Sequence, residues 1–92
     1  MHKFDIEINL HKTLKKLFRK DKLKYEIIWK KINEIINASI VDHYKNLRAP
    51  LQDFKRVHID KNFVLIFKYD KIKDKILFYD FDHHDKIYLK RY

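Results

Sequence analysis

The spacing of apolar residues changes twice along this 92-residue chain, and the order of the patterns restricts the fold more than any other feature. Apolar and polar residues alternate over residues 4–10, the period of a strand with one buried face. Apolar residues then recur at helical spacing over residues 14–36, with a break near Asp21. This break predicts a helical hairpin of residues 11–20 and 22–37, with Asp21 as the cap of the second helix.

The second half of the chain has the pattern of a sheet. Residues 40–53 mix Asp, His and Asn with the only proline, Pro50, and predict a loop. Three strands follow at residues 55–60, 63–69 and 75–81, and the middle one is almost wholly apolar, as expected for a central strand covered on both faces. The turns between them should use Asp and Asn, because the chain has no glycine.

This order of elements predicts an α+β fold in a single domain of residues 1–92. An N-terminal strand, a helical hairpin and a three-stranded antiparallel meander should form one twisted sheet, with the helices on one face and the other face open. In the first strand of the meander, Arg56 and His58 alternate with Val57 and Ile59. Because neighbours on a strand point to opposite faces, Arg56 and His58 should lie on the open face.

Positive charge predicts an anionic partner. The chain has 22 Lys and Arg against 13 Asp and Glu, a net charge of +9 with neutral histidines. Residues 12–24 hold seven of the basic residues and one acidic residue, Asp21. This cluster favours ribosomal RNA or an acidic stretch of a protein partner, and a solvated helix face in a lysine-rich chain is the alternative.

Missing residue types exclude several kinds of chemistry. Without cysteine, the chain has no disulfide, no thiolate zinc site and no cysteine nucleophile. Without glycine, it lacks the phosphate-binding loops of Rossmann and P-loop proteins, which need backbone free of side chains. No apolar run reaches the roughly 18 residues of a membrane span and the N-terminus lacks the apolar stretch of a signal peptide, so a cytoplasmic location without membrane contact is expected.

The second half of the chain carries the residue types that cut RNA. An RNA strand brings its own nucleophile, the 2′-hydroxyl, so cleavage needs a base, an acid and cations around the phosphate, and no metal or other cofactor is expected. Histidine can act as acid or base, and aromatic side chains can stack on unpaired bases. The residues of these types are Lys55, Arg56, His58, Phe63, His83, His84, Tyr88, Arg91 and Tyr92.

Four segments of this half resemble a known family. Residues 49–52 (APLQ), 55–59 (KRVHI), 62–67 (NFVLIF) and 82–88 (DHHDKIY) are similar to the C-terminal half of YafQ-type members of the RelE/ParE superfamily of toxins. The resemblance is close over residues 49–88 and covers the N-terminal strand and helices in outline. It implies a RelE-like fold, a ribosome-dependent endoribonuclease that cleaves translated messenger RNA, and a cognate RelB- or DinJ-like antitoxin that neutralises it. A ParE-like inhibitor of DNA gyrase and an inactive RNA- or protein-binding module of the same fold are the alternatives.

The resemblance also implies roles for individual residues. His58 and His84 would transfer protons, Arg56 would stabilise charge, and Tyr88 would stack on a base or contact phosphate. The residues expected to bind RNA are Lys55, Asn62, Phe63, His83, Arg91 and Tyr92, with Lys15, Lys16 and Arg19 in the basic cluster.

The chain departs from the family pattern at three positions. Asn62 replaces an aspartate, Ala49 a histidine and Asp80 an arginine. Positive charge is needed at a site that cleaves RNA, because the transition state carries additional negative charge. The basic residues expected to supply it are Lys55 or Arg56, together with Arg91.

Carboxylates and imidazoles gather near the end of the last strand, and such groups are good ligands for divalent metal ions. The five residues are Asp80, Asp82, His83, His84 and Asp85. Alternation along a strand sends Asp80 and Asp82 to the face opposite His83, so no metal site is expected there. We expect His83 to lie on the other face from His84 as well.

Overall fold

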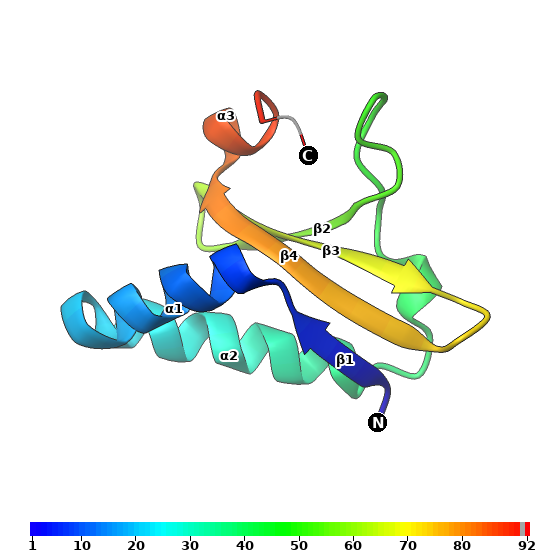
Figure 1. The fold of residues 1–92 in the computed structure, drawn as a ribbon, viewed down its shortest axis with the longest axis horizontal. Coiled ribbons are helices and arrows are strands. Elements are labelled where there is room, and N and C mark those ends of the chain that lie inside the picture. Colours follow the sequence, from blue (N-terminus) through cyan, green and yellow to red (C-terminus); the bar gives the residue numbers. More distant parts are fainter. Residues whose placement is uncertain (91) are drawn as a thin grey trace.

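The computed structural model describes residues 1–90 and 92, which form a four-stranded sheet with two long helices against one face (Figure 1). The elements in chain order are β1 (Lys3–Ile6), α1 (Ile8–Lys20), α2 (Lys22–Ile36), the 3-10 turn η1 (Val41–His43), β2 (Lys55–Ile59), β3 (Phe63–Asp70), β4 (Lys75–His83) and α3 (His84–Ile87). The strand order is β1-β4-β3-β2, with β1 parallel to β4 and the other neighbours antiparallel. The predicted α+β fold, with a helical hairpin and a three-stranded meander, is confirmed.

The first strand is shorter than the alternation predicted. A change of direction at Glu7 ends β1, so Ile8 and Leu10 lie in α1 and the prediction of a strand over residues 4–10 is wrong. Two hydrogen bonds of Glu7 mark the boundary between β1 and α1. Its N–H donates the last sheet bond to β4 (2.8 Å), and its carboxylate accepts from Asn9 N (2.8 Å) as a helix cap. Leu10 is fully buried because it shares a helix face with the leucines that follow at helical spacing.

Asp21 lies between the two helices and caps the second, as predicted. Lys24 N donates to Asp21 Oδ1 at 3.1 Å, while Asp21 N donates to Leu17 O at 2.8 Å and closes α1. The two helices therefore form a tight hairpin that packs on one face of the sheet (Figure 1). In the described part of the chain, no helix combines the length and the apolar character needed to cross a membrane.

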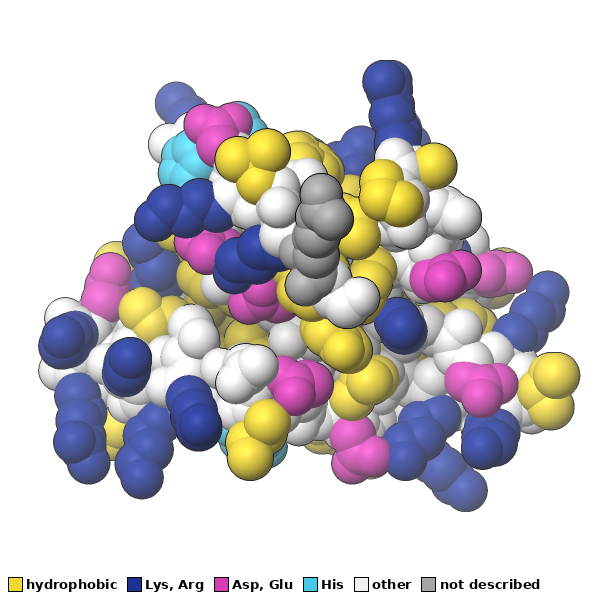
Figure 2. Space-filling model, turned by 45° about the horizontal axis from the view of Figure 1, so that its top comes forward, with side chains coloured by type: hydrophobic (Ala, Val, Ile, Leu, Met, Phe, Trp, Pro, Cys, Tyr) yellow, Lys and Arg dark blue, Asp and Glu magenta, His cyan; other side chains and the backbone are white. Residues whose placement is uncertain are grey.

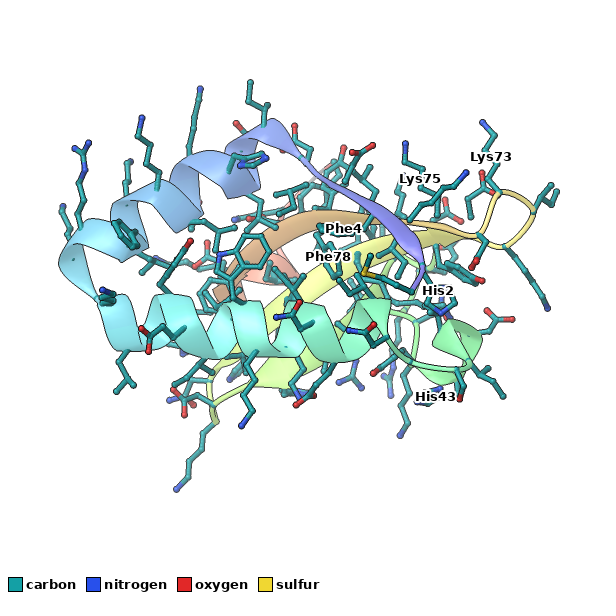
Figure 3. The ribbon with its side chains drawn as sticks, turned by 90° about the horizontal axis from the view of Figure 1, so that it is seen from below. His2, Phe4, His43, Lys73, Lys75 and Phe78 are labelled. Carbon is teal, nitrogen blue, oxygen red and sulfur yellow. The ribbon has the colours of Figure 1, made fainter. Side chains whose placement is uncertain are left out.

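The main hydrophobic core fills the space between the helical hairpin and the sheet. Figure 3 shows Phe4 of β1 next to Phe78 of β4, and their ring centroids are 6.0 Å apart in an edge-to-face contact. Full burial of each large apolar side chain stabilises the fold by about 1.5–3 kcal/mol. The buried members are Leu10, Leu14, Ile28, Ile32, Ile35, Ile36, Val41, Ile59, Leu65, Phe67, Ile76, Phe78 and Phe81.

The second face of the sheet was predicted to be open, and over part of its area this is wrong. A smaller apolar cluster lies there, formed by Leu47, Phe54, Val64, Ile66 and Ile87. Its members come from the segment before β2, from β3 and from α3. Figure 1 shows this segment and α3 rising from the sheet as two separate walls. The uncovered part of the second face therefore lies between this segment and α3.

The tight turns of the meander use aspartate, as predicted from the lack of glycine. Asp60 (φ 59°) and Asp74 (φ 51°) both occupy the left-handed region. Short polar side chains tolerate this region better than other non-glycine residues do, because they can bond to the local backbone.

Candidate active site

A cleft of about 510 Å³ opens on the second face of the sheet, between residues 46–51 on one wall and α3 on the other. Figure 2 shows the surface hollowed between two raised parts. The lining residues are Asn46, Leu47, Arg48, Ala49, Pro50, Leu51, Arg56 and Tyr88. The cleft thus combines apolar walls, two guanidinium groups and one phenol, which suits an anionic ligand of nucleotide size.

β2 presents Arg56 and His58 to this face, as the alternation predicted. Their side chains approach each other, with Arg56 Nη1 3.3 Å from His58 Nδ1. In the sheet register His58 is opposite Val64, which is in turn opposite Asp82 near the end of β4. His58 therefore lies at the same end of the sheet as α3, which begins directly after β4.

Arg48 is a cation of the cleft that the sequence analysis did not select. Arg48 directly precedes Ala49. Its position beside the family-like segment of residues 49–52 was the sequence signal that could have identified it. The ion pairs among residues 1–90 and 92 involve neither Arg48 nor Arg56. Both guanidinium groups are therefore available to an anion.

Lys55 lies on the opposite face from Arg56, so the prediction that it joins the basic RNA-binding edge is wrong. Its side chain is buried, with 6% of the residue surface exposed. The ammonium group donates to Asp42 O (3.2 Å), Tyr44 O (3.0 Å) and Asn46 Oδ1 (3.0 Å). It also pairs with the Asp42 carboxylate at 3.4 Å. The N–H groups of the Lys55 ammonium are therefore directed to acceptors within the protein and away from RNA.

Phe63 also faces away from the cleft, on the side of the sheet that carries the helices. Its ring stacks on Phe81, with centroids 5.3 Å apart and planes at 12°. Lys24 Nζ lies 3.9 Å from the centroid of the same ring. Phe63, which was expected to bind RNA, therefore lies on the other face of the sheet from His58.

Two histidines and an aspartate converge at the start of α3. The rings of His83 and His84 stack with centroids 4.6 Å apart, and the Asp85 carboxylate lies 2.9 Å from His84 Nδ1 and 3.6 Å from His83 Nδ1. The predicted separation of the two histidines is wrong, because strand alternation ends at His83. The N–H of His84 donates to Asn62 O (2.9 Å), which ties this turn to the exposed turn before β3.

These three side chains could hold a metal ion. One ligand atom from each of His83, His84 and Asp85 lies within 4.8 Å of the others, and imidazole and carboxylate suit divalent ions such as Zn²⁺. Figure 2 shows cyan and magenta side chains side by side on the α3 wall. Asp80 and Asp82 lie on the other face from His83, as alternation predicted.

Asp80 and Asp82 hold the C-terminal segment. Lys90 Nζ lies 2.7 Å from Asp80 Oδ2 and 2.9 Å from Asp82 Oδ2, and the Tyr92 hydroxyl donates to Asp80 at 2.8 Å. Burial lowers the pKa of Lys90, but its bonds to the two carboxylates have the larger combined effect and raise it. Lys90 thus brings a positive charge beside Asp80, where the resemblance implied an arginine. Arg91 lies outside the described residues.

Tyr88 is the exposed aromatic residue of the cleft. It follows His84 by about one helical turn, its N–H donates to His84 O (3.4 Å), and 47% of its surface is exposed. Tyr92 instead packs its ring against Phe54, with centroids 5.0 Å apart. Of the two tyrosines, only Tyr88 lines the cleft.

The basic residues Lys15, Lys16 and Arg19 are exposed on α1, on the other side of the sheet, and the structure does not bring them to the cleft. Figure 2 shows Lys and Arg side chains gathered over this part of the molecule. A groove of about 500 Å³ runs between α1 and α2, lined by Ile8, His11, Lys12, Leu14, Lys15, Phe18, Tyr25 and Trp29. Within the described residues, the buried Trp29 Nε1 has no acceptor.

Comparison with known proteins identifies close relatives. No family model matches the chain. A protein of Methanocaldococcus jannaschii described as the candidate toxin RelE4 is 52% identical over 91 residues, which cover 99% of this chain and 95% of that protein. An uncharacterised protein of Methanosarcina mazei is 44% identical over 88 residues, or 96% of this chain and 100% of that protein.

Solved structures share the fold at low sequence identity. A metal-bound toxin from Helicobacter pylori aligns with a TM-score of 0.73 at 18% identity, over 95% of this chain and 99% of its own. A mutant of YafQ from E. coli aligns with a TM-score of 0.73 at 13% identity, over 96% and 99%. A chain of the toxin-antitoxin complex RelBE2 from Mycobacterium tuberculosis aligns with a TM-score of 0.59 at 15% identity, over 90% and 98%.

Proposed function

This chain belongs to the RelE family of toxins, the toxin components of toxin–antitoxin systems, and we propose that it is a ribosome-dependent endoribonuclease that cleaves translated messenger RNA. The observation that carries the proposal is the cleft. It is lined by two guanidinium groups without a carboxylate partner among the described residues and by the exposed ring of Tyr88, and His58 contacts one of these groups, that of Arg56. Cations, an imidazole and an aromatic platform are the groups that RNA cleavage requires.

In the proposed reaction, the 2′-hydroxyl oxygen of the RNA attacks the adjacent phosphorus and the bond to the 5′-oxygen breaks. The products are a 2′,3′-cyclic phosphate and a free 5′-hydroxyl. One histidine takes the proton of the 2′-hydroxyl, and the other gives a proton to the leaving 5′-oxygen. His58 and His84 carry these two roles, and Arg56 stabilises the additional negative charge of the transition state.

Neighbouring groups orient both histidines. Arg56 Nη1 donates toward His58 Nδ1 (3.3 Å), and the Asp85 carboxylate lies 2.9 Å from His84 Nδ1. In each ring the other nitrogen is then directed to the RNA. Tyr88, one helical turn after His84, stacks on a base next to the cleaved bond.

Primer extension on a translated messenger, after induction of the protein, tests this proposal. Wild-type protein should create new 5′ ends within the translated region, and His58→Ala should abolish them. His43→Ala is the matched control, because His43 is an exposed histidine of η1 on another part of the surface (Figure 3). Intact messages together with DNA broken through trapped gyrase would contradict the proposal and favour gyrase inhibition. Intact messages and intact DNA would favour an inactive binding module.

We also propose that a cognate antitoxin covers the groove between α1 and α2. Ile8 and Phe18 are exposed at this groove, and burying such apolar side chains against a protein partner stabilises the contact. The rim carries Lys12 and Lys15, so a matching segment would be apolar on one side and acidic on the other. A chain of the toxin-antitoxin complex RelBE2 has a similar fold, which supports an antitoxin as the partner. Binding to the folded toxin alone would also stabilise this small protein.

Co-purification with the protein encoded by the neighbouring gene tests the partner. Wild-type toxin should retain that protein and lose cleavage activity. Phe18→Glu should weaken binding at least about tenfold, because it puts a carboxylate at an apolar groove that accepts acidic side chains. Ile72→Glu, at a residue that is 98% exposed in the β3–β4 turn, should leave binding unchanged. Equal binding by both variants would contradict the groove, and no binding by wild type would contradict the antitoxin.

A further inference from the structure

Two arginine side chains reach the cleft from different segments, and each is carried by anchored backbone. In the loop that carries Arg48, Leu51 N donates to Arg48 O (2.9 Å) and Leu47 N donates to Phe54 O (2.9 Å). Leu47 and Phe54 are buried in the smaller apolar cluster, which attaches the loop to the sheet. Arg56 is part of β2, and its N–H donates to the segment that precedes the loop (2.9 Å). The backbone thus holds both arginines at the cleft before any ligand arrives.

The positive charge of this pair is not balanced within the described residues. The ion pairs found there involve other side chains, and the polar contact of Arg56 is to His58. Two guanidinium groups at one cleft repel each other unless an anion lies between them. The positive charge at the cleft therefore favours the binding of an anionic ligand.

We infer that Arg48 and Arg56 together bind one phosphate of the RNA strand, an inference that rests on the proposed RNA-cleaving function. A guanidinium group binds phosphate oxygens with two parallel hydrogen bonds, and two such groups can share the oxygens of one phosphodiester. The resemblance implied a histidine at the position of Ala49. Arg48, the residue directly before it, supplies a positive charge there instead. Lys55 cannot do so, because its donors are used internally.

The rest of the cleft fits the nucleotide attached to this phosphate. Pro50 and Leu51 form an apolar wall, and Tyr88, the residue after α3, presents an exposed ring. A volume of about 510 Å³ lies within the roughly 300–1,000 Å³ range of small-ligand sites. One base can therefore lie between the two walls while the arginines hold its phosphate.

Binding of a short single-stranded 2′-O-methyl RNA, measured by fluorescence anisotropy at several salt concentrations, tests the pair. This RNA keeps its phosphates but lacks the attacking hydroxyl. Arg48→Gln should raise Kd about tenfold and reduce the slope of log Kd against log salt by about 0.7, the contribution of one phosphate contact on a single strand. Arg48→Lys should keep the slope and recover only part of the affinity, because lysine lacks the planar fork.

Lys73→Gln is the matched control, since it removes one charge from the β3–β4 turn, where Lys73 points into solvent (Figure 3). It should change neither Kd nor slope. If Arg48→Gln and Lys73→Gln behave alike while wild type still cleaves messages, the arginine pair is refuted and the ribonuclease proposal survives. If wild type binds no RNA, the arginine pair is refuted, and if it also cleaves none, the proposed function fails too. Unfolding midpoints of all variants in urea confirm that the fold is unchanged.

Discussion

The imidazole rings of His83 and His84 stack, with their centroids 4.6 Å apart and their planes at 29°. Residues next to each other on a strand point to opposite faces, but β4 ends at His83 and α3 begins at His84. The change from strand to helix turns both rings toward Asp85. Neither histidine can be altered without changing the surroundings of the other.

The first prediction concerns this pair. His84→Ala should lower single-turnover cleavage on programmed ribosomes by about 10²–10⁴-fold, the usual contribution of a general acid or base. His83→Ala should cost about tenfold, because it removes the ring against which His84 packs but no proton-transfer group. His43→Ala should have no effect. Equal losses for His83→Ala and His84→Ala would show that proton transfer is wrongly assigned to His84.

The second prediction concerns metal ions. Treatment of programmed ribosomes with a zinc-selective chelator, which leaves their Mg²⁺ in place, should leave cleavage unchanged, because the nucleophile in the proposed reaction is the RNA hydroxyl itself. Added Zn²⁺ should slow cleavage, since the three ligand atoms of His83, His84 and Asp85 can bind it and occupy His84. Asp85→Asn should weaken this inhibition. Loss of activity on treatment with this chelator, restored by Zn²⁺, would contradict the proposed mechanism.

The third prediction concerns stability. Lys55→Met should reduce the free energy of unfolding by about 1–3 kcal/mol in urea titrations, because it leaves part-buried acceptors from Tyr44 and Asn46 without a donor. Lys61→Met, in the exposed turn before β3, should change it by less than about 0.5 kcal/mol. Equal stability of the two variants would mean that the Lys55 network contributes nothing to folding.

The fourth prediction concerns pH. The Ala38 carbonyl and the Asp74 carboxylate accept from the two ring nitrogens of His2, each at 2.6 Å, and raise the pKa of His2 above its ordinary value of 6.5. Its contribution to stability is therefore complete below about pH 6.5 and is lost as the pH rises through the raised pKa of the folded state.

Thermal unfolding from about pH 6 to about pH 9 measures this effect. The difference in Tm between wild type and His2→Gln should shrink as the pH rises. A constant difference for His2→Gln would show that the charged form of His2 does not stabilise the fold.

The sequence predicted the elements whose signals are local. The two helices and the three-stranded meander follow from apolar spacing over many residues, and the Asp21 cap follows from one side chain beside a helix end. The prediction of a strand over residues 4–10 failed because the alternating pattern is short. So short a pattern also fits a strand followed by the first turn of a helix. The Glu7 cap decided between them.

The site was predictable only where it depends on strand alternation. Arg56 and His58 share a face because β2 is regular. The same alternation sends Lys55 to the opposite face, but its acceptors could not be predicted, because they come from η1 and the following segment, whose path depends on tertiary packing. The same irregular segment brings Arg48 to the cleft, so apolar spacing carried no sign of it.

The parallel pairing of β1 with β4 joins the two ends of the sequence, with Lys3 opposite Lys75. Contacts between residues so far apart form late in folding, because a long segment must first be brought to a compact state. During synthesis the helical hairpin and the β2–β3 hairpin can form as they emerge, but β1 must wait for β4. The α3 wall of the cleft emerges later still. The proposed RNA-cleaving surface therefore forms only after β4 and α3 have been synthesised.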